Sequence, residues 1–555
     1  MTDSPELVFA ALGGLGEIGM NCALYGFGPP KKKKWLMVDL GVAFAGDDLP
    51  GIDLIMPDFR FVDKIKNDIV GLIITHAHED HIGALADLWP RLGVQVYATK
   101  FAAGLAEARR LGEPGAPKIP IKIVAQNARF DIGPFDVEFI PVAHSIPESC
   151  ALAIRTPAGL VVHTGDWKID ATPGIGLPTD EKRLRELGDE GVLALICDST
   201  NVMREGESPS EADVAKNLTA LVGRASGRVV ITTFASNVAR LRAAAEAGFA
   251  NGRQVMIMGR AMERVVAVAR ECGYLDNVPQ FIGQDAYARL PRDKLLALAT
   301  GSQGEPRAAL ARIAEDAHPT ATLAPGDIVV FSSRTIPGNE KAVGKIINGL
   351  VAQGIEVVTD RTQLVHVSGH PRRMELAKMY AWLKPKIAVP AHGEPLHLSE
   401  HAAFAKAAGV GKVIRALDGD VVRLSQTDAG IINQIEHGRQ YKDGEILLPP
   451  GDDCIGQRRK LSLAGVISVA LALGPKGDLA GDPDVMIAGL PERTRQGAGL
   501  DEIIDAAIFE TFENLPKGKR RDADSVSAAV ERGVRNAVNA VWGKKPSVHV
   551  LVVEV

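Results

Sequence analysis

Residues 75–81, THAHEDH, place three histidines and one aspartate in one short segment directly after the apolar stretch 69–74. A lone histidine after a strand is more often a packed or surface residue. Histidines and an aspartate in H-x-H-x-D-H spacing can instead converge on a metal ion, because imidazole and carboxylate groups suit borderline cations such as zinc or manganese. The segment therefore predicts a metal site at the end of a strand.

Three further residues stand at the ends of apolar segments elsewhere in the chain. His144 ends FIPVAH, Asp166 ends VVHTGD and His392 ends IAVPAH. Each alone would be better explained as a structural residue, but together with the first cluster they supply seven ligands, enough for two metal ions. We assign His76, His78 and His144 to one metal, Asp80, His81 and His392 to the other, and Asp166 as the bridge. Asp39, which ends WLMVD, is expected to support a ligand histidine.

The elements that must position these residues are short apolar strands. Segments such as LVFAAL, IVGLIITH and VEFIPVAH in residues 1–207 run about four to eight residues, and the last two end on a histidine. Open α/β sheets place their sites at the carboxyl ends of strands. From Ser208 the pattern changes to helices that alternate with strands such as RVVITTF and DIVVFSS, which indicates a parallel sheet. Ser208 is expected to cap the first of these helices, with Glu211 as its capping-box partner.

The pattern of a strand followed by a histidine returns in VHVSGH and IAVPAHGE, so the middle block is interpreted as a domain inserted into another. The predicted metal-binding domain comprises 1–207 and 359–450, the insert 208–358, and a small C-terminal α/β domain 458–555. The last domain is expected to hold three strands, with helices near 500–514 and 523–541. Residues 447–457, LLPPGDDCIGQ, are expected to be a linker.

The composition is that of an ordinary globular protein, with 46% hydrophobic and 24% charged residues among 555. The net charge of −5 gives no global attraction for nucleic acid, so phosphate groups would have to meet local basic residues and metal ions. The five cysteines are scattered, which disfavours a disulfide scaffold or a thiolate zinc cluster. With no signal-peptide pattern and no apolar run of about 18–20 residues, we expect a soluble cytoplasmic protein without membrane association.

The H-x-H-x-D-H segment resembles the metal motif of the metallo-β-lactamase superfamily, and the middle block resembles the insert of the β-CASP nucleases. The whole chain is similar to the bacterial ribonuclease J family, strongly over about residues 7–450 and more loosely in the tail. The similarity rests on ALGGLGEIG (11–19), TFASNVAR (233–240), TGSQGEP (300–306), SSRTIPGNE (332–340) and HVSGH (366–370). Ala77 and Pro371 depart from the glycine and alanine usual in the family, and neither is a predicted ligand.

The resemblance implies an α/β fold: a metallo-β-lactamase αββα sandwich with an inserted α/β β-CASP domain and a small C-terminal α/β domain. It implies a hydrolase that cuts RNA phosphodiester bonds with two divalent metal ions, zinc being expected and manganese or magnesium the alternatives. Asp80 or Asp166 would orient the attacking water. His370 would give a proton to the departing 3′-oxygen or hold the scissile phosphate. The products would be a 5′-phosphate and a 3′-hydroxyl.

A nuclease that starts at a 5′ end needs a pocket for the terminal monophosphate, and turns rich in glycine and serine form such pockets. By resemblance, two segments are expected to bind RNA phosphate: Phe234, Ala235, Ser236 and Asn237, and then His366, Val367, Ser368, Gly369 and His370. The first segment could instead be only a helix cap made by Ser236 or Asn237. Arg240, Arg260 and Arg334 are candidate contacts to RNA phosphates, or alternatively structural ion pairs.

The favoured function is a 5′-to-3′ exonuclease that prefers 5′-monophosphate ends of single-stranded RNA and also cuts internally, in messenger decay and ribosomal RNA maturation. By resemblance we expect a homodimer or homotetramer and partners in an RNA-degradation complex. One alternative is a hydrolase of a small ester, lactone or thioester, against which the insert argues. A second is a non-catalytic RNA-binding β-CASP subunit, against which the complete ligand set argues. A DNA-directed nuclease is the third, since contacts to the 2′-hydroxyl are not visible in motifs.

Overall fold

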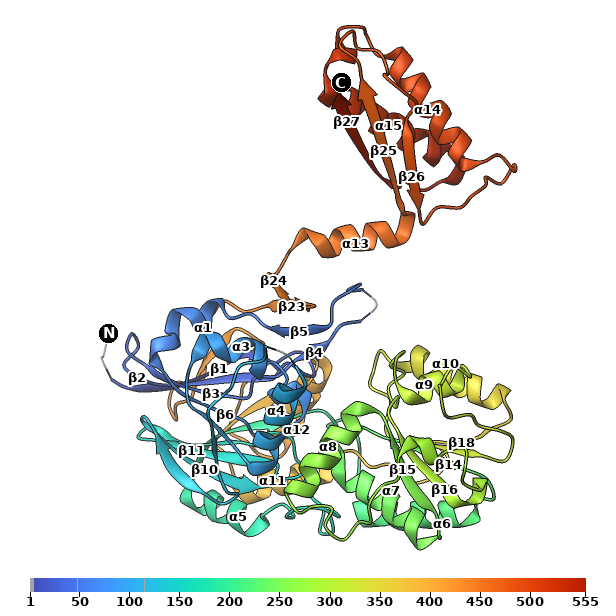
Figure 1. Ribbon diagram of the computed structural model, residues 1–555. Helices are drawn as coiled ribbons and strands as arrows, with labels where there is room; N and C mark the ends of the chain where they lie inside the picture. The colour runs from blue at the N-terminus through green and yellow to red at the C-terminus, as the bar shows by residue number, and fades with distance from the viewer. Residues whose placement is uncertain (1–3, 47, 114) are drawn as a thin grey trace. The chain divides into compact units, whose positions relative to one another are not determined.

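The computed structural model describes residues 4–46, 48–113 and 115–555 (Figure 1). Contacts between residues group the chain into two units. The first comprises the chain up to Phe44 together with Leu54–Gln440, and the second comprises Ala45–Asp53 together with Tyr441–Val555. Within the first unit, two mixed sheets pack face to face and a separate parallel sheet lies in the middle of the sequence.

The first sheet of the sandwich has the strand order β22-β21-β1-β2-β3-β6-β7-β8. Its strands are β1 (Glu6–Gly13), β2 (Cys22–Gly28), β3 (Lys34–Val38), β6 (Ile69–Ile73), β7 (Val96–Ala98), β8 (Ile121–Ile123), β21 (Asp420–Arg423) and β22 (Gly430–Gln434). Strands β3, β6, β7 and β8 run parallel, so β6, β7 and β8 are each reached by a crossover. Those crossovers carry the helices α1 (Arg60–Ile65), α3 (Leu85–Leu92) and α4 (Lys100–Gly112).

The second sheet has the strand order β20-β19-β13-β12-β11-β10-β9. Its strands are β9 (Arg129–Ile132), β10 (Phe135–Pro141), β11 (Cys150–Thr156), β12 (Gly159–His163), β13 (Val192–Asp198), β19 (Ile387–Ala391) and β20 (Lys412–Val413). Its inner face meets the first sheet in a core that includes Phe9, Leu36 and Phe139. Its outer face packs against α5 (Glu181–Glu190), α11 (Arg373–Leu383) and α12 (Pro395–Ala407). The expected αββα sandwich is therefore confirmed.

The middle of the chain forms a parallel sheet with the strand order β15-β16-β14-β17-β18. In the sequence, this sheet is inserted between strands β13 and β19 of the sandwich. Its strands are β14 (Val229–Thr232), β15 (Gln254–Met258), β16 (Leu295–Ala299), β17 (Ile328–Phe331) and β18 (Glu356–Val358). Its main helices are α6 (Glu211–Arg224), α7 (Val238–Ala250), α8 (Arg260–Glu271), α9 (Ala309–Ala314) and α10 (Glu340–Ala352). Helices α9 and α10 pack against it through Leu310, Ile346 and Leu350. The insert is thus an α/β domain; its boundaries at 208 and 358 stay a prediction.

The predicted cap of α6 is wrong by two residues. Ser210 is the N-cap, and Asp213 completes its capping box. Ser208 instead donates its hydroxyl to Glu375 over 2.7 Å. The carboxylate of Glu211 is buried against basic side chains, so it is not available to cap the helix.

The second unit confirms the expected strands and helices of the tail. Strand β25 (Val466–Leu473) lies between β26 (Asp484–Ala488) and β27 (Ser547–Glu554). Helices α14 (Leu500–Asn514) and α15 (Ala523–Trp542) pack on this sheet through a shared apolar core.

The predicted linker at 447–457 is partly wrong, because α13 (Asp453–Ala464) begins inside it, capped by Asp452. The expected start of the last domain at 458 stays a prediction. Arg459 Nε donates to the carbonyl oxygen of Asp48 over 2.5 Å, which ties α13 to the short segment 45–53 of the same unit. Among the described residues, the structure contains no helix long and apolar enough to cross a membrane.

Candidate metal centre and active site

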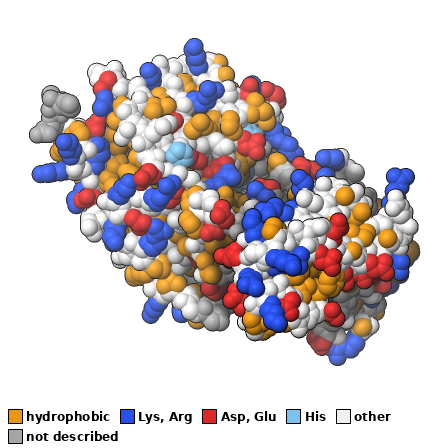
Figure 2. All heavy atoms as spheres, turned by 90° about the horizontal axis from the view of Figure 1, so that it is seen from above, with side chains coloured by type: hydrophobic (Ala, Val, Ile, Leu, Met, Phe, Trp, Pro, Cys, Tyr) orange, Lys and Arg blue, Asp and Glu red, His pale blue; other side chains and the backbone are white. Residues whose placement is uncertain are grey.

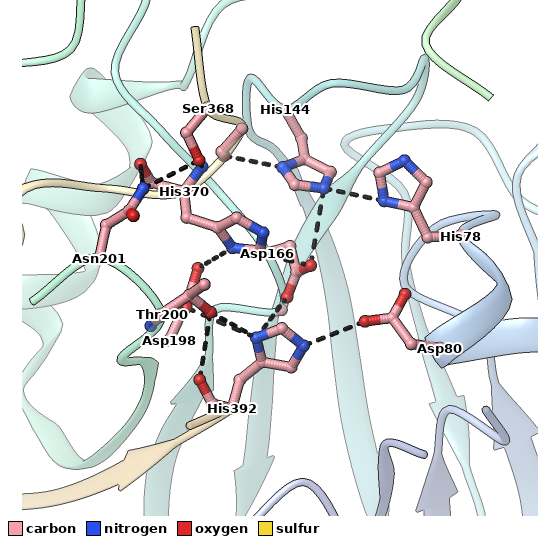
Figure 3. A network of polar contacts seen from close by, with 12 residues as sticks. His78, Asp80, His144, Asp166, Asp198, Thr200, Asn201, Ser368, His370 and His392 are labelled. Carbon is pink, nitrogen blue, oxygen red and sulfur yellow. Dashed lines mark hydrogen bonds and ion pairs between the residues drawn. The ribbon is translucent and has the colours of Figure 1, made fainter. Parts of the chain in front are cut away.

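The seven predicted ligands lie at or shortly after the ends of strands of the sandwich, and the structure brings them together. Figure 3 shows His78, Asp80, His144, Asp166 and His392 of this set. His76 and His78 follow β6, Asp80 and His81 lie in the short helix α2 (Glu79–Ile82), His144 follows β10, Asp166 follows β12 and His392 follows β19. Neighbouring strand ends meet at one edge of the packed sheets, so Asp80 and His392 become neighbours although 312 positions separate them. The fold thus assembles a site that has no single local motif.

The first ligand group consists of His76, His78, His144 and Asp166, whose nearest donor atoms all lie within 4.8 Å of one another. His78 Nδ1 lies 3.2 Å from His76 Nε2 and 3.0 Å from His144 Nε2. Asp166 Oδ2 lies 3.7 Å from His76 Nε2 and 3.6 Å from His144 Nε2. These four residues are the ones that the sequence analysis assigned to one metal ion and to the bridging position.

The second ligand group consists of Asp80, His81, His392 and Asp166, with the same 4.8 Å limit between donor atoms. Asp80 Oδ2 lies 3.2 Å from His392 Nε2 and 3.6 Å from His81 Nε2. The other oxygen of Asp166, Oδ1, lies 3.3 Å from His81 Nε2. The carboxylate of Asp166 therefore turns one oxygen to each group, as a bridging ligand must.

The outward-facing ring nitrogens are held by hydrogen bonds. His81 Nδ1 donates to Asp39 Oδ2 over 2.7 Å, so Asp39 supports a ligand histidine as predicted. His144 Nδ1 donates to the carbonyl oxygen of Gly369 over 2.8 Å. A neutral imidazole that donates from one nitrogen carries a lone pair on the other, and the lowered pKa of His144 favours this state. The pKa of His81 is raised, because nearby carboxylates outweigh the effect of burial, so this ring must lose a proton to bind a metal ion.

The electrostatics of the site suit cations. Burial lowers the pKa of each histidine of the first ligand group, that of His78 to about 4, so these rings are neutral and able to bind a metal. Burial also lowers the pKa of His392, but the carboxylates of Asp166, Asp198 and Asp80 together outweigh it and raise that pKa to about 10, so this ring must give up its proton when it binds a metal ion. Within the described part of the chain, Asp166 Oδ1 is buried without a hydrogen-bond partner. Converging lone pairs and an unpartnered buried carboxylate oxygen fit a pair of divalent cations.

Asp198 is a site residue that the sequence analysis missed. It ends β13, and its Oδ2 accepts a hydrogen bond from His370 Nδ1 over 2.8 Å (Figure 3). Together with Asp166, His370 and His392 it forms a third set of side chains whose spacing could hold a metal ion. The signal was present, because VLALICD is another apolar strand that ends on an aspartate. Thr200, two residues later, lies with its hydroxyl 2.7 Å from His392 Nδ1.

The segment 366–370 lies against the metal centre. Asn201 Nδ2 donates to Ser368 Oγ over 2.9 Å and to the carbonyl oxygen of His370 over 3.1 Å. A Cβ on Gly369 would lie 2.6 Å from the ring of His144, so the close approach of this turn requires glycine. In this segment His366, Ser368 and His370 are half-buried, whereas Val367 and Gly369 are buried.

The other predicted phosphate-binding segment lies where β14 runs into α7. Phe234, Ala235 and Ser236 are half-buried. Asn237 is buried, and its side chain accepts a hydrogen bond from the backbone N–H of Arg240 over 2.9 Å as the N-cap of α7. Asn237 therefore makes the helix cap that was the alternative interpretation, and the three residues before it keep exposed surface.

The three candidate arginines lie in different surroundings. Arg240 is fully buried and pairs with Glu211 over 2.7 Å, so its expected contact with RNA phosphate does not fit its position. Arg260 is exposed at the start of α8. Arg334 is half-buried, and its guanidinium lies 3.7 Å from Asp360. Arg260 and Arg334 therefore keep the exposure that a phosphate contact needs, and Arg240 does not.

Comparison with known proteins gives four matching family models, which follow one another along the chain. These are "Metallo-beta-lactamase superfamily" at 17–180, "Ribonuclease J, beta-CASP domain" at 226–350, "Zn-dependent metallo-hydrolase RNA specificity domain" at 354–416 and "Ribonuclease J C-terminal domain" at 453–555. The first match contains six of the seven predicted ligands, and the third contains His392.

Similar proteins extend over the whole chain. A ribonuclease J from Sinorhizobium meliloti is 51% identical over 555 residues, which are 100% of this chain and 98% of that protein. One from Mycolicibacterium smegmatis is 37% identical over 98% of this chain and 97% of its own length, and one from Corynebacterium glutamicum is 38% identical over 97% and 74%. A solved structure of a protein of unknown function from Enterococcus faecalis V583 has a similar fold, with a TM-score of 0.52 and 17% identity over 76% of this chain and 100% of that one. The sandwich with its two ligand groups, the matching family models and these full-length relatives together place the chain in the ribonuclease J family.

Proposed function

We propose that this chain is a two-metal ribonuclease that degrades single-stranded RNA from a 5′-monophosphate end in the 5′-to-3′ direction and also cuts internally. The observation that carries the proposal is the sharing of Asp166 by the two ligand groups, each with its donor atoms within 4.8 Å of one another. RNA as the substrate is supported by membership of the ribonuclease J family and by the match to the RNA specificity domain model.

The two ligand groups would each hold one divalent cation. Zinc is the first choice for sites of imidazole and carboxylate ligands, with manganese or magnesium as alternatives. When bound, the cations supply an acidified water molecule and neutralise negative charge on the phosphoryl oxygens. Asp80 and Asp166, which face each other across this centre, would accept hydrogen bonds from the attacking water and orient it toward phosphorus.

His370 would handle the proton of the leaving group. Its Nδ1 donates to Asp198 over 2.8 Å, which leaves the Nε2–H free to hold the scissile phosphate or to protonate the departing 3′-oxygen. Burial lowers the pKa of His370, but the nearby carboxylates of Asp198 and Asp166 outweigh burial and raise it. A raised pKa favours the protonated ring that a general acid requires.

The 5′-phosphate would be bound by the two turns 234–237 and 366–370. The half-buried residues Phe234, Ala235 and Ser236 precede the N-terminus of α7, where backbone N–H groups attract anions. His366 and Ser368 offer an imidazole and a hydroxyl from the other turn. Because basic and acidic side chains are interspersed on the face drawn in Figure 2, phosphate binding would depend on such local groups, with Arg260 and Arg334 as further contacts.

The family also suggests the setting in which the enzyme acts. We propose a cytoplasmic homodimer or homotetramer that acts in messenger decay and ribosomal RNA maturation, alone or with partners in an RNA-degradation complex. Light scattering on the full-length chain tests the assembly, since a monomer at micromolar concentration would contradict it.

The function is tested with RNAs that differ only in carrying a 5′-monophosphate, a 5′-triphosphate or a 5′-hydroxyl, with and without zinc or manganese. Mononucleotides are expected from the monophosphate RNA only, and not from single-stranded DNA of the same sequence or from small esters and lactones. The variant Asp80→Ala, His81→Ala is expected to be inactive. A matched control, Asp285→Ala, His318→Ala, removes the same residue types from the surface of the insert. Equal activity in both double variants would contradict the metal mechanism.

A further inference from the structure

Buried charged side chains form a continuous chain from the loop after Asp166 to the turn at 366–370. Lys168 and Arg240 are 0% exposed, Glu211 is 3% exposed and Asp170 is 4% exposed. The free energy lost when charged groups leave water can exceed the free energy gained from their mutual attraction. A buried network of this kind is therefore weak evidence for a gain in stability. The function of the network is better explained by the segments that it holds in place.

The network begins between two loops that carry metal ligands. The backbone N–H of Lys168, two residues after Asp166, donates to the carbonyl oxygen of Ala143 over 2.7 Å, directly before His144. The side chain of Lys168 pairs with Asp170 over 2.9 Å and lies 3.6 Å from Glu211. One fully buried lysine thus links the metal centre to the first helix of the insert.

Glu211 joins the sandwich to the insert. It is the first residue of α6, and its backbone N–H donates to Asp170 Oδ2 over 2.9 Å. One carboxylate oxygen faces Lys168, and the other pairs with a guanidinium nitrogen of Arg240 over 2.7 Å. The orientation of Arg240 is therefore set from the side of the sandwich.

Arg240 follows the first proposed phosphate-binding turn by three residues, and its side chain bonds the segment directly before the second. Its backbone N–H donates to Asn237, the last residue of the first turn, in a bond that a lysine at this position would also make. Its NH1 atom donates to the carbonyl oxygen of Val365 over 3.0 Å, directly before His366. The same nitrogen donates to Ser332 Oγ over 2.7 Å, and that hydroxyl donates to Val365 in turn over 2.6 Å. Arg240 and Ser332 together tie the second turn to the start of α7.

We propose that Arg240 is a positioning residue of the 5′-phosphate pocket, fixing the turns at 234–237 and 366–370 relative to each other without touching RNA. This inference rests on the proposed function, because the pocket is itself a proposal. Lysine cannot replace Arg240, because only the planar guanidinium can bond Glu211, Ser332 and Val365 at once in different directions. The residue selects the 5′ end by shaping the pocket.

The test compares Arg240→Lys with Arg253→Lys. Arg253 is a matched control: it is also buried in the insert, and its guanidinium donates to the backbone carbonyls of Ala225, Gly227 and Leu295. In the full-length chain, hydrogen exchange at 233–238 and 364–370 is expected to become about 10-fold faster in Arg240→Lys and to stay unchanged there in Arg253→Lys.

A second measurement tests the preference of the enzyme for a 5′-monophosphate over a 5′-hydroxyl end. The ratio of kcat/KM for 5′-monophosphate over 5′-hydroxyl RNA is expected to fall about 10-fold in Arg240→Lys. Because the turn at 366–370 also carries His370, both RNAs lose any rate that depends on that residue, and the ratio isolates the effect on the 5′ pocket. Arg253→Lys should keep the wild-type ratio.

Unchanged exchange and an unchanged ratio in folded Arg240→Lys would overturn the proposal, and so would equal loosening of both turns in the two variants. If Arg240→Lys does not fold, Ser332→Ala is tested by the same two measurements. The ratio of kcat/KM for the two RNAs is then expected to fall about threefold. Wild-type exchange and a wild-type ratio in Ser332→Ala would overturn the proposal. A wild-type chain without any preference for the monophosphate would refute the proposed pocket. Hydrogen exchange would still report separately on whether Arg240 holds the two turns.

Discussion

The hydrogen bond from His81 Nδ1 to Asp39 Oδ2, 2.7 Å long, links a predicted metal ligand to a carboxylate outside both ligand groups. Asp39 is 1% exposed and has a φ of 63°, in the left-handed region that is costly for a residue with a side chain. Its carboxylate also accepts hydrogen bonds from the N–H and the hydroxyl of Thr75 over 2.7 and 2.8 Å. One buried carboxylate thus orients both a ligand ring and the strand end that carries the H-x-H-x-D-H segment.

The variant Asp39→Asn should weaken the metal site without unfolding the chain. An asparagine oxygen is a weaker acceptor for His81, so the affinity of the second ligand group for zinc or manganese is expected to fall by about 10- to 100-fold. Competition with a chromophoric chelator measures it. Asp420→Asn, at a buried aspartate that accepts from Leu417 N, is the control and should bind metal normally. Equal affinities in the two variants would contradict the role of Asp39.

The variant Gly369→Ala should displace His144. The added methyl group would lie 2.6 Å from the imidazole of His144, against the turn whose carbonyl orients that ring. We expect loss of metal from the first ligand group and a fall in kcat of about 100-fold or more. Gly344→Ala, in α10 with open space around the new methyl group, should behave like the wild type. Metal analysis of the purified variants checks this, and full occupancy in Gly369→Ala would refute it.

The variant Asp198→Asn should slow the chemical step and leave RNA binding intact. It removes the carboxylate that orients His370 and raises its pKa. A fall in kcat of about 100-fold is expected, within the usual contribution of a general acid. KM for 5′-monophosphate RNA should change little. Single-turnover cleavage checks this, and a rate within about threefold of the wild type would exclude Asp198 from the proton pathway.

The stability of the first unit should depend on pH through Asp418. Burial, followed by the nearby carboxylate of Glu17, raises the pKa of Asp418 to about 8. The folded chain therefore holds a proton that the unfolded chain releases, so its stability falls as the pH rises from about 4 to about 8. In Asp418→Asn this loss is absent, and its thermal midpoint should exceed that of the wild type at pH 8 by at least about 2 °C. Scanning calorimetry checks this; parallel pH profiles would contradict it.

The convergence of the predicted ligands could be expected from the sequence. His144, Asp166 and His392, which lie outside the 76–81 segment, each follow an apolar strand, and strand ends gather at one edge of a sheet. Asp198 ends a strand in the same way, but its role depends on His370, 172 positions away. Pairing over that distance is decided by the fold. A single sequence offers no pattern that connects the two.

The errors at α6 and Arg240 have one physical cause. Ser208 with Glu211, and Ser210 with Asp213, fit the capping-box spacing equally well, so local pattern cannot choose between them. The choice is made by the interior, where Lys168 and Arg240 bind Glu211 and leave Ser210 to cap the helix. An arginine beside a predicted phosphate-binding segment is expected to lie at the surface. The first residues of α7 are buried, however, so the side chain of Arg240 points into the interior.

The central claim is tested most directly by titrating the metal-free chain with zinc or manganese while measuring bound ions and mononucleotide release from 5′-monophosphate RNA. The two ligand groups predict two ions per chain and activity that appears only as the second ion binds. Asp166→Ala should bind neither ion tightly, because both groups share that carboxylate. Full activity in the metal-free chain, or with one ion per chain, would contradict the two-metal account.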